Sequence, residues 1–271
     1  MACNIVSPSD SAGLLVLLKA LRSALNKNFD KSHKTISMAV PIQTFTNAQG
    51  NYMSNVRIYA EYLDWVSMMA YDLNGPWDSN AAPNGPLYNI PGKGENASIA
   101  LGGYNWASAG MPKDKIVIGT PWYSHSFLTT AVPTVSNFYV TVSPNTPQGD
   151  WNDVPSADPC PGQVRAYSGE WKWRNYFLQK VLKNPTTTIA PWERHFDPVT
   201  QTPWMYNHET KIINMYDDPV SLKSKAMFAR CEGYRGTMIW SLDMDYGDML
   251  IDALQETRNI HGKCHVAPAP K

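Results

Sequence analysis

Apolar and polar positions along the chain alternate in patterns that predict helices and strands in turn. Residues 7–27, SPSDSAGLLVLLKALRSALNK, predict an amphipathic helix with Ser7 as its cap and Pro8 in the first helical position. The run ISMAVPI at 36–42 predicts a buried strand, and a short helix is expected over 54–63. The long helix is expected to bury one apolar stripe, formed by Leu14, Leu17, Leu18, Leu21 and Leu25.

The alternation continues beyond residue 60. LDWVSMMAYDLNGPWD, at 63–78, predicts a strand that is apolar on both faces up to Tyr71, as in a parallel sheet covered on both sides. A helix over 95–112 and a third strand over 115–127, KIVIGTPWYSHSF, are expected next. Near the end, a helix over 218–233, a strand over 236–245 and a helix over 247–260 complete the pattern. Strands and helices in this order predict an α/β fold.

A block in the middle of the chain breaks this pattern. Residues 129–214 consist of proline-rich, aromatic, strand-like pieces such as FYVTVS and TPWMYNHETKIINMYDD, which predict an inserted α+β module. We therefore expect the parallel βα parts at 1–128 and 215–260, on either side of this insertion. The proline- and alanine-rich residues 261–271 have the character of a linker.

Charge and cysteine content exclude several classes of function. The 271 residues have a formal net charge of zero and no basic run, which argues against a nucleic-acid partner. No apolar stretch is long enough to span a membrane. Met1 to Val6 lacks the basic leader and apolar core of a signal peptide, which by itself predicts a cytoplasmic protein. The four cysteines match no metal-ligand spacing and allow three disulfide pairings.

Aromatic residues are more numerous than a core of this size needs. Ten Trp, fourteen Tyr and seven Phe are present, many of them beside Pro, Gly or Asn. Such neighbours place aromatic rings in loops and at cleft rims. The composition therefore indicates a flat, partly apolar ligand.

Side chains suited to chemistry follow the ends of the four expected parallel strands. In a parallel barrel these ends meet on one face, so a shared cleft is expected there. The simpler interpretation of Tyr71 and Asp72 is strand-end packing and turn formation. Asp243 and Asp245 are more simply solvated loop carboxylates than metal ligands, because no third ligand is nearby. The strand-end residues are Pro41, Tyr71 with Asp72, Tyr123 with His125, and Trp240 with Asp243.

These segments, in this order, resemble glycoside hydrolase family 18, the chitinase family. MMAYDLNGPWD resembles the sixth barrel strand with its Met-x-Tyr-Asp motif, IVIGTPWYSHSF the seventh, and GTMIWSLDMD the eighth. HFDPVTQTPWMYN and INMYDDPVSLKSKA resemble the end of the α+β insertion and the helix after it. The start, CNIVSPSDSAGLLVLLKALRSAL, is similar to the segment after the fourth strand of fungal-type members. The resemblance therefore implies strands five to eight of a TIM-type (β/α)8 barrel.

The resemblance also implies roles for individual residues. In this family the substrate's own N-acetyl oxygen is the nucleophile. Tyr71 would position that acetamide and Asp72 would hold the distorted sugar, both as supporting catalytic residues. His125 stands where many members have an arginine. The implied substrate-binding residues are Met69, which lines the pocket, Trp240, its floor, Trp77 and Tyr123, which flank the next sugar, and His125.

The general acid of the family is absent from this sequence. It belongs to an Asp-x-x-Asp-x-Asp-x-Glu run on the fourth strand, and no such run occurs in the 271 residues. General acid catalysis contributes roughly 10² to 10⁴ in rate, so we expect the chain by itself to be inactive. The resemblance implies chitin or N-acetylglucosamine oligomers as ligand, no cofactor, and an extracellular place of action.

Two other interpretations remain open. A groove lined by aromatic residues could hold chitin without cleaving it, as a lectin-like protein does. Alternatively, the chain could be a truncated product without a stable fold. The strands at 36–42 and 236–245 would each lie at an open, apolar sheet edge, and such edges favour self-association.

Overall fold

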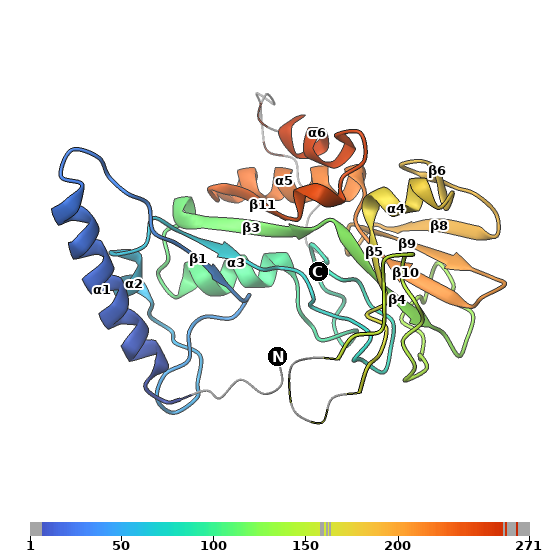
Figure 1. The fold of residues 1–271 in the computed structure, drawn as a ribbon, viewed down its shortest axis with the longest axis horizontal. Helices are drawn as coiled ribbons and strands as arrows, with labels where there is room; N and C mark the ends of the chain where they lie inside the picture. Colours follow the sequence, from blue (N-terminus) through green and yellow to red (C-terminus); the bar gives the residue numbers. More distant parts are fainter. Residues whose placement is uncertain are drawn as a thin grey trace.

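The computed structural model describes residues 7–157, 160, 162, 164–256, 258 and 264, which fold around two sheets (Figure 1). The first is a parallel sheet in the order β1-β2-β3-β11, made of β1 (Ser37–Val40), β2 (Trp65–Met68), β3 (Ile116–Pro121) and β11 (Gly236–Trp240). The second is antiparallel, in the order β5-β4-β10-β9-β8, made of β5 (Glu170–Lys172), β4 (Tyr123–Leu128), β10 (Ile212–Met215), β9 (Thr202–Asn207) and β8 (Trp192–Asp197). The predicted α/β class is confirmed.

Helices and short elements complete the two parts. The parallel strands are accompanied by α1 (Asp10–Asn28), α2 (Arg57–Ala60), α3 (Ile99–Ser108), α5 (Pro219–Glu232) and α6 (Met249–Glu256), with 3-10 turns η1 (Lys113–Lys115) and η2 (Leu242–Met244). The antiparallel sheet is accompanied by α4 (Trp173–Leu178) and the hairpin β6 (Leu182–Asn184) and β7 (Thr187–Thr188). Among the described residues, no helix is long and apolar enough to cross a membrane.

The long first helix differs from its sequence prediction in two ways. Its cap residue is Ser9 rather than Ser7, whose backbone N–H instead donates to the Asp10 carboxylate. The leucines also do not share one environment, because Leu18 is buried whereas Leu17 and Leu21 are 61% and 40% exposed. Leu18 belongs to the core, with Leu14 and Leu25 packed against it, whereas the rest of the stripe faces solvent.

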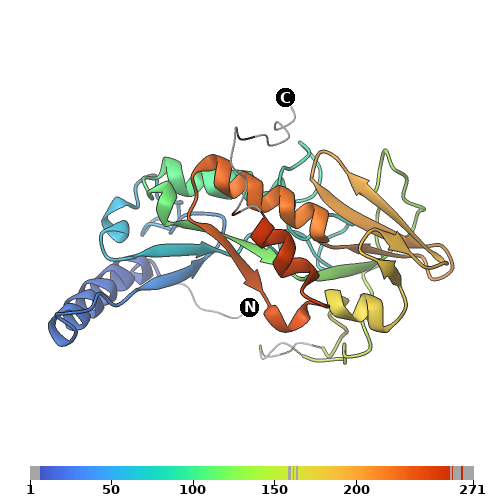
Figure 2. The same cartoon turned by 90° about the horizontal axis from the view of Figure 1, so that it is seen from above.

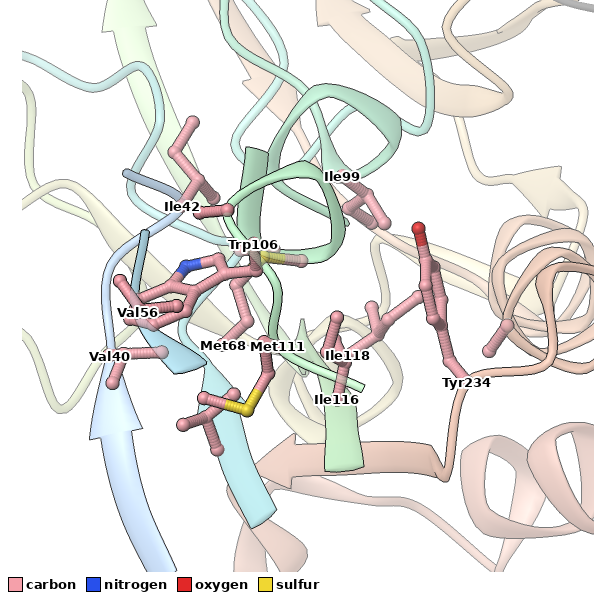
Figure 3. Packing of buried hydrophobic residues seen from close by; sticks show 14 of the residues in the cluster. Val40, Ile42, Val56, Met68, Ile99, Trp106, Met111, Ile116, Ile118 and Tyr234 are labelled. Carbon is pink, nitrogen blue, oxygen red and sulfur yellow. The ribbon is translucent and has the colours of Figure 1, made fainter. Parts of the chain in front are cut away.

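The core of the parallel part lies between its sheet and α3 (Figure 3). Trp106 of α3 is fully buried, and its indole N–H donates to the Pro41 carbonyl at 2.9 Å. The central strand β3 is buried at every residue, whereas β1 and β11 at the two edges are partly exposed. The core therefore thins out toward both edges of this sheet.

The predicted single strand over 115–127 is two strands. β3 ends at Pro121, and β4 begins at Tyr123 in the antiparallel sheet, where it pairs with β10 and β5. Trp122 lies between them, fully buried, and its backbone N–H donates to the Trp240 carbonyl at 2.9 Å. The Trp122 N–H thus continues the pairing with β11 one residue beyond Pro121, and the next residue, Tyr123, pairs in the antiparallel sheet.

Much of the aromatic surplus is core rather than cleft. Trp122, Trp171, Trp173, Tyr176 and Tyr216 are buried together where the two sheets meet. The rings of Trp171 and Tyr176 stack in nearly parallel planes, with their centroids 5.1 Å apart. The expectation that the aromatic excess lies mainly at a cleft is therefore only partly correct.

The cysteines fall into two states. Cys160 is disulfide-bonded, whereas Cys231 and Cys264 are free. Cys231 is partly buried. Burial and the neighbouring Cys264 thiol raise the pKa of Cys231 to about 11.

Candidate functional site

A cavity of about 470 Å³ lies at the ends of β1 and β2. Met69, Tyr71 and Asp72 follow β2 directly, and all three line this cavity. The other lining residues are Pro41, Ile42, Gln43, Leu73, Glu95 and Ala97. The Met-x-Tyr-Asp segment singled out in the sequence therefore borders a hollow large enough for part of a small ligand.

Asp72 is held by contacts from two other segments, strand β4 and the turn at Asn84. The Tyr123 hydroxyl donates to Asp72 Oδ1 at 2.6 Å, and His125 Nε2 lies 2.8 Å from the same oxygen. The backbone N–H of Asp72 donates to Asn84 Oδ1 at 2.6 Å, and its φ is +55°. The Asp72 side chain is still 48% exposed. One carboxylate oxygen is therefore fixed by protein donors, while the group remains accessible to a ligand.

The charges of this cluster shift the pKa values in opposite directions. Burial raises the pKa of Asp72, but hydrogen bonds from His125 and Tyr123 and the His125 charge outweigh it, so this pKa lies below its usual range. Burial and the Asp72 charge raise the pKa values of both Tyr71 and Tyr123. The site thus holds an ionised carboxylate beside two protonated phenols, which act as hydrogen-bond donors.

Tyr71 depends on a glycine in the neighbouring strand. A Cβ atom at Gly119 of β3 would lie 2.9 Å from the Tyr71 ring and 2.5 Å from the Met68 carbonyl oxygen. The Tyr71 ring also lies edge-on to that of Tyr123, with centroids 6.3 Å apart. Gly119 therefore makes the space that lets Tyr71 lie across the sheet toward Tyr123.

Trp77 lies on a turn next to the same cluster. The Gly75 N–H donates to Asp78 Oδ2 at 2.9 Å, and the Trp77 ring packs so closely on Gly75 that a Cβ there would come within 2.2 Å of it. The ring centroid is 5.3 Å from that of His125, and Trp77 is 63% exposed. Trp77 is therefore an exposed aromatic surface held beside His125.

Trp240 stands apart from this cluster. It is the last residue of β11, where it pairs with Pro121 at the end of β3, and it is 56% exposed. Among the described residues, neither Trp240 nor Trp77 belongs to the lining of the 470 Å³ cavity. The structure thus joins Tyr71, Asp72, Trp77, Tyr123 and His125 in one set of contacts, with Met69 sharing their cavity and Trp240 at a neighbouring strand end.

Sequence reasoning missed three contributors to the site. Asn84 is buried and links segments, since it accepts from Asp72 and donates to the Tyr123 carbonyl at 3.1 Å. Its setting, Pro-Asn-Gly-Pro, reads as an ordinary turn. Gly119 sits inside an apolar strand, where an isolated glycine signals close approach by another group. Asp78 has a pKa raised by burial and by the charge of Glu95, although the Gly75 N–H opposes this.

The two aspartates after β11 have structural partners. Asp245 accepts from the backbone N–H of Tyr246 and from those of Leu250 and Ile251 in the first turn of α6. Asp243 accepts from the Ser241 hydroxyl. Within the described part of the chain, no group of three or more His, Cys, Asp or Glu residues is arranged to hold a metal ion.

Comparison with known proteins places this arrangement in a family. The model of Glycosyl hydrolases family 18 matches residues 4–245. A chitinase-like effector of Moniliophthora roreri is 30% identical over 94% of this chain, and one of Moniliophthora perniciosa is 28% identical over 94%. The chain spans 63% and 59% of the length of these two relatives.

A solved structure shows the same fold. The crystal structure of a chitinase from Rhizomucor miehei superposes with a TM-score of 0.87 at 33% identity, covering 96% of this chain and 69% of that one. The family model spans most of the sequence, and the α/β architecture agrees with that of a TIM-type barrel family. The chain therefore belongs to glycoside hydrolase family 18.

Proposed function

We propose that this protein binds polymers of β-1,4-linked N-acetylglucosamine at the cavity beside Tyr71 and Asp72, and that the chain by itself does not hydrolyse them. The observation that carries the proposal is the fixed Asp72 carboxylate. Tyr123 and His125 both engage its Oδ1, which orients the carboxylate beside the cavity. A carboxylate next to a protonated phenol offers an acceptor and a donor to one acetamide group, whose N–H and carbonyl need that pair.

Each proposed role follows from the local chemistry. The Tyr71 hydroxyl stays protonated, because burial and Asp72 raise its pKa, and so can donate to the acetamide oxygen. Asp72 can accept from the acetamide N–H or a sugar hydroxyl. The exposed rings of Trp77 and Trp240 offer apolar faces on which pyranose rings can stack.

Hydrolysis needs an additional group. In the substrate-assisted reaction the acetamide oxygen attacks the anomeric carbon while an acid protonates the departing glycosidic oxygen. Asp72 is unsuited to donate that proton, because its lowered pKa keeps it ionised. Without a general acid the barrier rises by roughly 3 to 5 kcal/mol, the equivalent of about 10² to 10⁴ in rate.

An extracellular place of action is part of the proposal. Cys160 is disulfide-bonded, and disulfides persist mainly in oxidising compartments. The names of the two Moniliophthora relatives, chitinase-like effectors, are compatible with a second candidate function, chitin binding without catalysis in the whole protein.

The test measures binding and turnover separately. Calorimetric titration of the full chain with N-acetylglucosamine tetramer should give saturable binding, weakened about tenfold or more in Tyr71→Phe and Asp72→Asn, because each loses a hydrogen bond to the ligand. Tyr104→Phe, at an exposed position of α3, is the matched control and should bind like the parent.

A fluorogenic chitobioside then measures turnover, and none is expected. Turnover that disappears in Glu95→Gln would show that Glu95, at the cavity wall, supplies the acid, and would contradict the non-hydrolytic part of the proposal. A chain that melts cooperatively but binds no tetramer would contradict the binding part.

A further inference from the structure

Helices α5 and α6 lie side by side, with β11 between them in the sequence (Figure 2). Leu222 of α5 and Leu250 of α6 are both fully buried and belong to the same core cluster. After α5 the chain turns at Gly233, whose φ is +77°. The last turn of α5, which contains Cys231, is therefore held in place by the packing of the two helices.

The chain beyond α6 returns to the C-terminal end of α5. Glu256, the last residue of α6, pairs with Lys223 of α5 at 2.5 Å. Farther along, the Arg258 carbonyl accepts from the guanidinium of Arg230 at 3.4 Å. Because Arg230 lies two turns after Lys223 on the helix, these contacts follow α5 toward its end.

Two thiols meet at this end of the helix. The thiol of Cys264 is in hydrogen-bond contact with that of Cys231, the residue after Arg230. Both cysteines are free in this structure, Cys264 exposed and Cys231 partly buried. Because Cys264 is exposed, its side chain can turn toward Cys231 without disturbing the core.

The same chain already holds a disulfide. Cys160 is disulfide-bonded, and bonds of this kind persist mainly in oxidising compartments. An oxidant that reaches the protein there also reaches Cys264, because that thiol is exposed. Two thiols in contact under such conditions have both the partner and the oxidant that a disulfide needs.

We propose that Cys231 and Cys264 form an intramolecular disulfide that ties the chain beyond α6 to the end of α5. The oxidant is a small-molecule disulfide such as oxidised glutathione. The Cys264 thiolate attacks one of its sulfur atoms, forming a mixed disulfide and releasing one thiolate. Cys231 then loses its proton and attacks the Cys264 sulfur, which forms the protein disulfide and releases the second glutathione. Two protein thiols are oxidised, and one small-molecule disulfide is reduced to two thiols.

The surroundings of the two cysteines set the order of these steps. Burial and the neighbouring thiol raise the pKa of Cys231 to about 11, so this thiol is rarely ionised near neutral pH. The exposed Cys264 therefore reacts with the oxidant first. The resulting bond closes a loop that contains β11, η2 and α6, so Trp240 at the end of β11 belongs to a cross-linked segment.

The test treats the folded full chain with oxidised glutathione and then maps its disulfides. Trypsin cleaves after Arg230 and Lys263, so the two cysteines fall in different peptides unless a disulfide joins them. We expect the joined peptides, and an intact mass lower by two hydrogen atoms without bound glutathione. The melting temperature should rise by at least about 5 °C over that of the chain with free thiols, because the closed loop restricts the unfolded state.

Serine variants connect these effects to the two cysteines. Cys264→Ser, at an exposed position, should fold like the parent and should show no rise in melting temperature after the same treatment. Cys231→Ser should end as the mixed disulfide, with one glutathione on Cys264. A rise in melting temperature in Cys264→Ser equal to that in the parent would contradict the proposed bond.

Two further results would overturn the inference. A treated parent that melts cooperatively but keeps both thiols, or carries glutathione on each, would mean that the two sulfur atoms do not reach each other. A peptide that joins Cys264 to a different cysteine or to a second copy of the chain would mean that its partner is not Cys231. None of these measurements involves a sugar, so they test the inference independently of the proposed function.

Discussion

Asp72 and the residues around it account for the polar chemistry of the cleft. Its Oδ1 accepts from Tyr123 and His125, while its backbone N–H is held by Asn84. His125 is the main opponent of burial at Asp72, because its hydrogen bond and its charge both lower the pKa of that carboxyl group. The groups that face it are Asp72, Tyr123, Asp78 and, across the strand pair, Glu170.

Replacing His125 should change how binding responds to acid. The pKa of Asp72 is lowered in the folded protein, so its ionised form persists above that lowered pKa and is lost as the pH falls through it. The proposed binding of the tetramer should follow the same dependence on pH. His125→Gln removes the charge that opposes burial, so the midpoint of acid loss should move up toward the ordinary value of about 4.

Titrating tetramer affinity from pH 7 downward by tryptophan fluorescence measures that midpoint. His125→Arg, which keeps a positive charge, is the control and should retain the low midpoint. An unchanged midpoint in His125→Gln would mean that His125 does not set the charge state of Asp72.

Gly75→Ala should move the Trp77 ring without unfolding the protein. The new Cβ would come within 2.2 Å of the ring, and Trp77 is 63% exposed and free to swing outward. We expect a shifted tryptophan emission and an affinity for tetramer reduced by about three- to tenfold, the loss of roughly 1 kcal/mol of stacking. Gly13→Ala, whose Cβ meets nothing within 4 Å, is the control; equal effects in both variants would contradict the role of Trp77.

At the scale of elements, one carboxylate attaches α1 to the parallel sheet. Asp64 accepts from Arg22 at 2.6 Å and from the Ile36 N–H at 2.7 Å, and His33 Nε2 lies 2.6 Å from its other oxygen. Burial raises the pKa of Asp64, but the Ile36 amide, His33 and Arg22 together lower it below its ordinary value. The helix, the loop after it and the start of β1 thus share one anchor.

Loss of this anchor should make stability less dependent on acid. Because the pKa of Asp64 is lower in the folded state, its contribution is complete above the unfolded value of about 3.9 and disappears as the pH falls through the folded pKa. Asp64→Asn should lower the free energy of unfolding at pH 7. Below pH 4, the free energy of unfolding of this variant should fall less steeply with acid than that of the parent. Urea unfolding at pH 7, 4 and 3 provides the measurement, and Asp30→Asn, at an exposed position, is the control. If the free energy of unfolding of Asp64→Asn fell with acid as steeply as that of the parent, Asp64 would not be the source of the acid dependence.

At the scale of the whole molecule, a buried ion pair joins the two sheets through α5. Lys225 of α5 contacts both oxygens of Asp217, which follows β10, at 2.5 and 2.6 Å, and neither side chain is more than 1% exposed. Burial raises the pKa of Asp217 and lowers that of Lys225, with each partner opposing the shift of the other. The pair lies where the chain returns from the antiparallel part to the parallel part.

Replacing one partner of this ion pair should destabilise the fold more than replacing both. Lys225→Met leaves a buried carboxylate without its partner and should lower the free energy of unfolding by about 3 to 5 kcal/mol. Lys225→Met with Asp217→Leu removes both charges and should recover much of that loss. Circular dichroism melts of the parent, the single variant and the double variant measure this difference. A double variant no more stable than the single one would show that the unpaired charge does not cause the loss of stability.

The sequence by itself was sufficient for the α/β class, the position of most elements and the strand end followed by Tyr71 and Asp72, because apolar periodicity and turn residues are local signals. It was wrong about Tyr123 and His125, which lie in β4 of the antiparallel sheet and not at the end of a parallel strand. Only the tertiary structure decided how these residues meet. That Tyr123 and His125 share one oxygen of Asp72 depends on β4 leaving the parallel sheet after Pro121. That Asn84 and Gly119 serve the site depends on contacts between residues far apart in the sequence, such as that of Asn84 with Tyr123, 39 positions further on, and that of Gly119 with Tyr71. The exposure of Leu17 and Leu21 was likewise invisible in the leucine stripe, because a periodic pattern identifies an apolar face but not how much partner surface the fold provides to cover it.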